Sequence, residues 1–144
     1  MKKLLLSLIG LLAGMALAAG AMAATPNYSL SAQEQVIPIY LSGQRTATTA
    51  SVVKFTLPFA AKLVGVTTTA RASGGTTPTL TVDVKAGGTS VLSAPIAVTA
   101  GTVAEGTITT STLPDESAMT VDLAITGTSP TWDDITLLLT VVRR

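Results

Sequence analysis

The feature that most constrains this chain is a regular alternation of apolar and polar side chains after residue 24. Three segments in which every second residue is apolar show it clearly: 80–85, 119–125 and 135–141. Because successive side chains of a β-strand point to opposite faces, this period of two predicts strands with one face against a core. Threonine occurs 25 times, all between Thr25 and Thr140, and suits the same half-buried pleated surface. No window after residue 24 shows sustained helical periodicity.

Weaker strand candidates fill most of the remaining chain: 35–41, 51–57, 62–71, 89–93, 96–99 and 105–110. Gly87-Gly88 predicts a tight hairpin, because two glycines supply the positive φ values that such a turn needs. Looser turns are expected at Gly74-Gly75, Ala100-Gly101, Gly127 and 113–117. Pro38 cannot donate to a ladder, so the first strand is expected to be an edge strand or bulged.

Together these signals predict an all-β fold, a single antiparallel β-sandwich of eight or nine strands that is jelly-roll-like. An N-terminal apolar helix, either a signal peptide or an anchor, is expected to precede it. The expected organisation is a signal peptide or uncleaved apolar helix at 1–23, a linker at 24–35 and the β-sandwich domain at 36–144.

Residues 1–23 have the three-part layout of a bacterial secretory signal. Two lysines precede an apolar run at 4–17, and Ala21-Met22-Ala23 fits a signal peptidase site. An uncleaved membrane helix is the alternative, because about 20 uncharged apolar residues can span a bilayer. Removing these 23 residues and their two lysines leaves 121 residues with seven basic and eight acidic side chains. That length is enough for one domain with a single core.

One internal similarity has two interpretations. Residues 81–84 and 88–90 line up at an offset of 39 with 120–123 and 127–129, and six of the seven pairs are identical. Two strands in similar environments could converge on similar residues. The alternative is an internally duplicated sandwich, such as the two halves of a jelly roll.

The composition excludes several classes of function. Without His or Cys there is no Ser/His/Asp triad, no Cys nucleophile and no zinc site of the usual ligand set. Nine basic against eight acidic side chains, without a basic cluster, argue against nucleic-acid binding. We therefore expect no enzyme activity, no catalytic residues, no cofactor and no metal.

Four aspartates are candidates for a calcium site: Asp83, Asp122, Asp133 and Asp134. Adjacent strand residues diverge and the spaced calcium-loop pattern is missing, so solvated loop carboxylates are the preferred interpretation of Asp133 and Asp134. Asp83 and Lys85 share one strand face, which predicts a surface ion pair with a neighbouring strand.

Trp132 and Tyr40 are the candidate ligand contacts, because carbohydrate-binding sandwiches stack sugar rings on exposed aromatic side chains. Trp132 is expected in a loop at 128–134 that enters the last strand. There it could be an exposed platform, or it could seal the open end of a sandwich.

Four segments carry a resemblance to a known group: 71–84 (RASGGTTPTLTVDV), 90–96 (SVLSAPI), 98–108 (VTAGTVAEGTI) and 128–137 (TSPTWDDITL). In them the chain resembles small β-sandwich proteins of tailed bacteriophages, over about residues 36–144. The resemblance implies a virion structural or decoration role and no functional residues. The leader departs from it, because phage capsid parts assemble in the cytoplasm.

We therefore expect a structural or interaction protein, either a virion surface component or an exported relative that self-associates. Its charged content of 12% is about half that of soluble domains, which favours a homo-oligomer or packing against other structural proteins. The alternative is a secreted or periplasmic module that binds a glycan or cell surface. Contact with a membrane is expected only through residues 1–23, if they are uncleaved.

Overall fold

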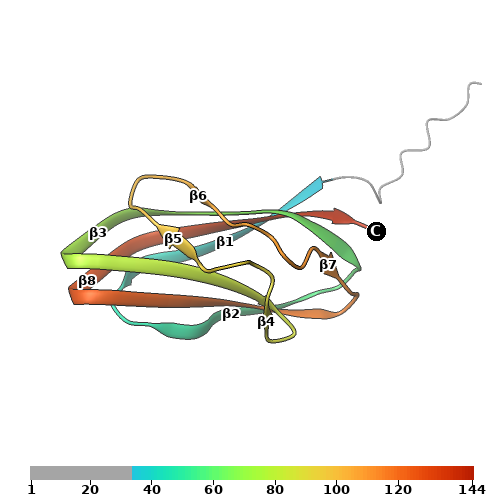
Figure 1. The fold of residues 1–144 in the computed structure, drawn as a ribbon, viewed down its shortest axis with the longest axis horizontal. Coiled ribbons are helices and arrows are strands. Elements are labelled where there is room, and N and C mark those ends of the chain that lie inside the picture. Colours follow the sequence, from blue (N-terminus) through green and yellow to red (C-terminus); the bar gives the residue numbers. More distant parts are fainter. Residues whose placement is uncertain (1–33) are drawn as a thin grey trace, which may run out of the picture.

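The computed structural model describes residues 34–144, and this part is an all-β antiparallel sheet (Figure 1). Its eight strands are β1 (Glu34–Arg45), β2 (Thr49–Leu57), β3 (Ala61–Ala86), β4 (Thr89–Ser90), β5 (Ile96–Val98), β6 (Ala104–Glu105), β7 (Thr112–Leu113) and β8 (Ser117–Arg143). The all-β antiparallel prediction is confirmed. The helix predicted at 1–23 and most of the linker predicted at 24–35 lie outside the described residues. Between residues 34 and 144 no helix is long and apolar enough to cross a membrane.

A long antiparallel ladder between β3 and β8 forms the centre of the molecule. It runs from the pair Ala61 and Arg143 to the pair Ala86 and Met119. The sequence predicted four separate strands here, at 62–71, 80–85, 119–125 and 135–141. That division is wrong, because the segments around Gly75 and Gly127 bend the chain without ending its pairing.

The bends in β3 and β8 interlock. Gly75 and Gly127 have φ values of 96° and 124°, which side chains rarely adopt. A Cβ atom on Gly75 would lie 2.4 Å from the carbonyl oxygen of Ser129, and one on Gly127 would lie 2.8 Å from that of Thr77. Glycine at both positions therefore lets the two backbones approach each other closely while their pairing continues on either side of the bend.

Each half of the central ladder has its own flanking strands. β1 pairs with the C-terminal half of β8, and β6 and β7 pair with the N-terminal half of β3. β2 pairs with the N-terminal half of β8, and β4 and β5 pair with the C-terminal half of β3. Figure 1 shows the sheet doubling back at the bends of β3 and β8, so that the two halves run alongside each other.

The core lies on the inner sides of the two halves and forms one cluster. Every residue predicted to point inward in the three clearest strands is at most 6% exposed: Leu80, Val82, Val84, Met119, Val121, Leu123, Ile125, Ile135, Leu137, Leu139 and Val141. Burial of these apolar side chains is the main stabilising contribution, at about 25 cal/mol per Å² of apolar surface.

Two local predictions are confirmed and one is wrong. Gly87 and Gly88 both have positive φ and join β3 to β4 as a two-residue hairpin. Pro38 lies in β1, which among residues 34–144 pairs with β8 on one side only. The strand expected at 105–110 is wrong, because regular pairing ends at Glu105. Beyond it the chain passes close over Ile96 and Leu92, leaving no room for a Cβ on Gly106.

The two similar segments turn out to be direct partners. Asp83 pairs with Asp122, and Val82 and Val84 pair with Leu123 and Val121 in the same ladder. Their glycines differ in role, because Gly88 makes a hairpin and Gly127 makes a bend. Segments 81–84 and 120–123 therefore share one environment, as the first interpretation expects.

Candidate functional site

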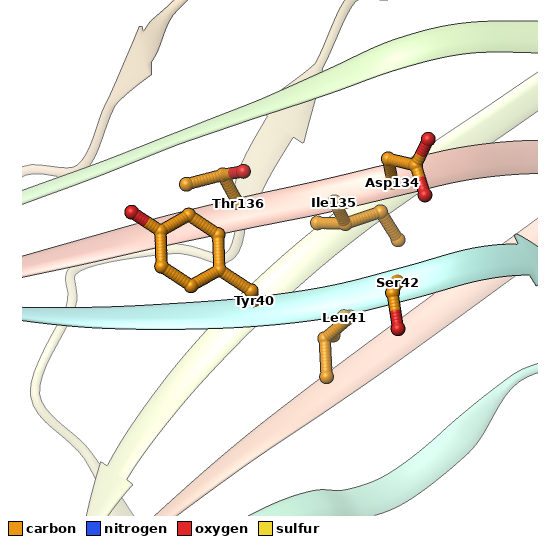
Figure 2. Close-up of a pocket in the computed structure, with 6 residues that line it drawn as sticks. All are labelled: Tyr40, Leu41, Ser42, Asp134, Ile135 and Thr136. Carbon is orange, nitrogen blue, oxygen red and sulfur yellow. The ribbon is translucent and has the colours of Figure 1, made fainter.

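Tyr40 lies on the outer side of edge strand β1, and 70% of it is exposed. It pairs with Thr136 of β8. A shallow hollow of about 230 Å³ lies beside it, and Figure 2 shows the residues from β1 and β8 that line it: Tyr40, Leu41, Ser42, Asp134, Ile135 and Thr136. The exposed ring of Tyr40 thus lines the same hollow as the hydroxyl-bearing residues Ser42 and Thr136 and the acidic residue Asp134.

Trp132 is 2% exposed and belongs to the core, so its assignment as an exposed ligand contact is corrected. It lies in strand β8 and not in a loop. Strict alternation from Ile135 would turn Trp132 outward. Asp134 has a φ of 49°, however, and this irregularity lets both Trp132 and Ile135 point inward. Trp132 and Tyr40 therefore do not form one exposed site.

Two aspartates of β8 each connect three strands, and we call these arrangements the aspartate bridges. In the first, Asp134 Oδ1 accepts a hydrogen bond of 2.8 Å from the Gly43 amide in β1. Its Oδ2 accepts one of 2.7 Å from Arg71 Nε in β3. Gly43 has a φ of 77° and lies in a bulge between Leu41 and Gln44. The carboxylate thus holds an irregular outer strand to the central ladder.

The second aspartate bridge repeats this design in the other half of the sheet. Asp122 Oδ1 accepts a hydrogen bond of 2.6 Å from the Ser51 amide in β2. Its Oδ2 lies 2.6 Å from Lys85 Nζ in β3. Ser51 has a φ of 51° and lies in a bulge between Thr49 and Val53. The ion pair predicted for this strand face is therefore formed by Lys85 with Asp122.

The bridges lower the pKa of both aspartates. The hydrogen bond from Lys85, followed by that from the Ser51 amide, lowers the pKa of Asp122. The hydrogen bond from Arg71, followed by that from the Gly43 amide, lowers the pKa of Asp134. Hydrogen bonds to a charged carboxylate favour its charged form, so both groups stay ionised well into the acid range.

The carboxylates of the four candidate calcium ligands do not lie together. Asp83 pairs across the ladder with Asp122 and accepts a hydrogen bond from Ser90, whereas Asp133 and Asp134 contact Arg71 in the other half of the sheet. Within residues 34–144 no three acidic side chains are grouped as metal ligands would be. Asp133 and Asp134 are strand residues, which corrects their placement in a loop.

The outer side of one half has an uncharged centre, with Glu34 and Lys62 at one end, Arg71 and Asp134 at the other, and Glu105 of β6 beside Thr67. At this centre, three rows of paired residues cross β1, β8 and β3 without a charged side chain. These rows are Val36, Thr140 and Gly65; Pro38, Leu138 and Thr67; and Tyr40, Thr136 and Thr69. We call this surface the uncharged face. The corresponding strands of the other half carry four charged residues: Lys54, Asp83, Lys85 and Asp122.

Sequence reasoning missed the uncharged face and both bridges. The run from Val36 to Leu41 has no charged or strongly polar member, so alternation could not show which side of β1 faces outward. Gly43, two residues beyond the strand predicted at 35–41, was an available signal of an irregular backbone. The partners of Asp122 and Asp134 depend on strand pairing, which periodicity does not reveal.

No protein-family model matches this chain, and no curated protein matches it significantly. Among solved structures, the chain is similar to one described as the structure of infectious bursal disease virus Gx strain, at 14% identity and a TM-score of 0.41. The match covers 78% of this chain and 33% of that chain, so this chain spans about a third of its length. Proposals about function therefore rest on the residues of this chain.

Proposed function

We propose that this protein is a non-enzymatic structural β-protein that works by packing against other protein surfaces, including copies of itself. The observation that carries the proposal is the uncharged face, on which Val36 is 56% exposed and Tyr40 is 70% exposed. An exposed surface that combines apolar and threonine side chains without charge suits burial against another protein. We interpret the folded sheet as a jelly-roll-like β-sandwich, an architecture suited to this role.

The arrangement of ionisable groups supports a role without catalysis. Asp122 and Asp134 use their carboxylate oxygens to hold backbone amides and cations of neighbouring strands. A general acid or base needs a pKa near the working pH, and the pKa of each is shifted away from it. The proposal accordingly includes no cofactor, no metal and no nucleic-acid partner.

We place the protein on a virion surface or, if residues 1–23 act as an export signal, on the outside of the cell or in the periplasm. The resemblance to small tailed-phage β-sandwich proteins supports the first location, and the leader supports the second. Both locations would place the domain among protein neighbours, which suits the uncharged face.

Purification from the native source tests this proposal. We expect the chain to co-fractionate with a particle or cell-surface assembly, and light scattering to show more than one copy per complex. Intact mass would show whether residues 1–23 remain. A monomer that fractionates alone at every concentration would contradict the structural role.

A glycan-binding module is the second candidate, favoured by the hollow beside Tyr40. Ser42 and Thr136 line this hollow together with the exposed ring, and hydroxyl groups beside an aromatic ring suit the binding of a sugar. Glycan-array binding that disappears in Tyr40→Ala but persists in Thr56→Ala on β2 would favour this candidate. No binding to the array in the unaltered protein would count against it.

A further inference from the structure

We propose that a second copy of this chain stacks on the uncharged face, about a two-fold axis that runs along β8. This inference rests on the proposed self-associating function and adds its surface and its symmetry. The sizes of the side chains on this face favour that axis. Val36 and Tyr40 lie on β1, one side of β8, whereas the smaller Gly65 and Thr69 lie on β3, the other side.

Rotation about β8 exchanges the two sides of the uncharged face. Val36 of one copy then lies over Gly65 of the other, and Tyr40 lies over Thr69. Leu138, at the centre of the middle row, lies over its own equivalent. Val36 and Tyr40 of one copy thus each face a smaller residue of the other, as the self-complementarity of a two-fold interface needs.

The charges at the end of the uncharged face support the same axis. Glu34 and Lys62 flank Val142 in the next row, one on β1 and one on β3, and both are exposed. Within residues 34–144 neither makes an ion pair. Rotation about β8 brings Glu34 of each copy to Lys62 of the other, so two ion pairs form. An axis across the strands would instead bring Lys62 near Arg71 of the other copy, which is already paired with Asp134, so Lys62 would gain no free acidic partner.

The edge of β1 is less suited to association than its face. Pro38 removes one amide donor from the middle of the strand, and the bulge between Leu41 and Gln44 interrupts its regular geometry. Proline and bulges on an edge strand hinder pairing with another strand. A second copy therefore stacks on the face of the sheet and does not extend it.

The size of the surface predicts a weak dimer. Three strands about 4.8 Å apart and the five residues from Val36 to Tyr40 at about 3.4 Å each cover roughly 250 Å² per copy. That area is about a third of what each partner contributes in a typical stable complex. We therefore expect a micromolar dissociation constant.

Sedimentation velocity of the protein, purified in the form that its host produces, measures this constant. We expect Tyr40→Glu to weaken the dimer by at least about 10-fold, because it places an unpaired charge in the interface. Thr56→Glu is the matched control, since Thr56 is an exposed residue of β2, the outer strand of the other half. It should leave the dissociation constant unchanged.

A charge-exchange experiment tests the axis itself. Glu34→Lys alone sets lysine against Lys62, and Lys62→Glu alone sets glutamate against Glu34. Each variant should dimerise about 3- to 10-fold more weakly than the unaltered protein. An equimolar mixture of the two variants restores both attractive pairs, so it should form heterodimers with the original affinity.

The outcomes separate this inference from the proposed function. The inference is overturned if Tyr40→Glu dimerises as strongly as the unaltered protein, or if the mixture of charge variants does not regain the original affinity. In either case the proposed self-association would still hold, but through another surface. A dimer with a micromolar dissociation constant would be largely formed at about 200 µM. If the protein is still monomeric at that concentration, both the inference and the proposed self-association are overturned.

Discussion

At the scale of single residues, the aspartate bridges show how carboxylates support an irregular sheet. Asp122 and Asp134 each lie opposite a bulge of an outer strand and each accept a hydrogen bond from a bulge amide, that of Ser51 or of Gly43. Backbone amides in bulges lose their ladder partners, and leaving such donors unpaired is destabilising. The cation on β3 completes each bridge and keeps the carboxylate charged.

Replacing Asp122 by alanine should destabilise the fold by about 1–2 kcal/mol, because it removes a charge-assisted hydrogen bond and leaves the Ser51 amide without its acceptor. Urea denaturation at pH 7 measures this change. Asp115→Ala, in an exposed turn outside the bridges, should change the free energy of unfolding by less than about 0.5 kcal/mol. An equal effect of the two substitutions would show that the bridge contributes nothing specific.

The bridges also predict how stability depends on acid. The pKa of Asp122 and that of Asp134 are lower in the folded chain than in the unfolded chain. Their contribution is therefore present above the unfolded value of about 3.9 and is lost as the pH falls through the folded value. Denaturation curves from pH 6 to pH 2 should show this loss. In the double variant Asp122→Asn and Asp134→Asn the loss should be smaller, and an unchanged pH profile would rule out this origin.

At the scale of elements, the sequence predicts which segments are strands better than where they end. Inward-facing residues such as Val82, Val121 and Leu137 were identified correctly because burial of one face imposes a period of two. The continuity of β3 and β8 was not identified, because a glycine can either end a strand or bend it. Which of these occurs at Gly75 depends on its contact with the backbone of Ser129, far along the chain.

Gly75→Ala should therefore be more destabilising than an ordinary substitution of a turn glycine. It combines an unfavourable φ of 96° with a Cβ 2.4 Å from a carbonyl oxygen, and we expect a loss of at least about 2 kcal/mol. Gly87 is the matched control, because its φ is also positive, at 56°, and no atom lies within 4 Å of its added Cβ. Gly87→Ala should lose about 1 kcal/mol. Thermal denaturation compares the two, and equal losses would mean that the bend tolerates the methyl group.

At the scale of the whole molecule, the halves of the sheet share two chain segments but present different outer surfaces. Alternation predicted a buried and an exposed side for each strand. It did not predict that Tyr40 would stand on an uncharged face while Lys85 and Asp122 gather on the other, because that depends on which strands pair. Trp132 departs from the alternation and does not lie in the predicted loop, because the backbone is irregular at Asp134.

Because β3 and β8 pass through both halves, the two halves should unfold together. Leu123 is 1% exposed and lies in the N-terminal half of β8, so Leu123→Ala should destabilise the domain by about 2–5 kcal/mol. If unfolding is a single transition, amides near Leu137, in the C-terminal half of β8, should lose as much hydrogen-exchange protection as those near Leu123. Thr56→Ala, at an exposed position of β2, should leave protection unchanged in both halves. Loss of protection confined to the half that contains Leu123 would show that the bends uncouple the two halves, and the continuous ladder would then join two independent units.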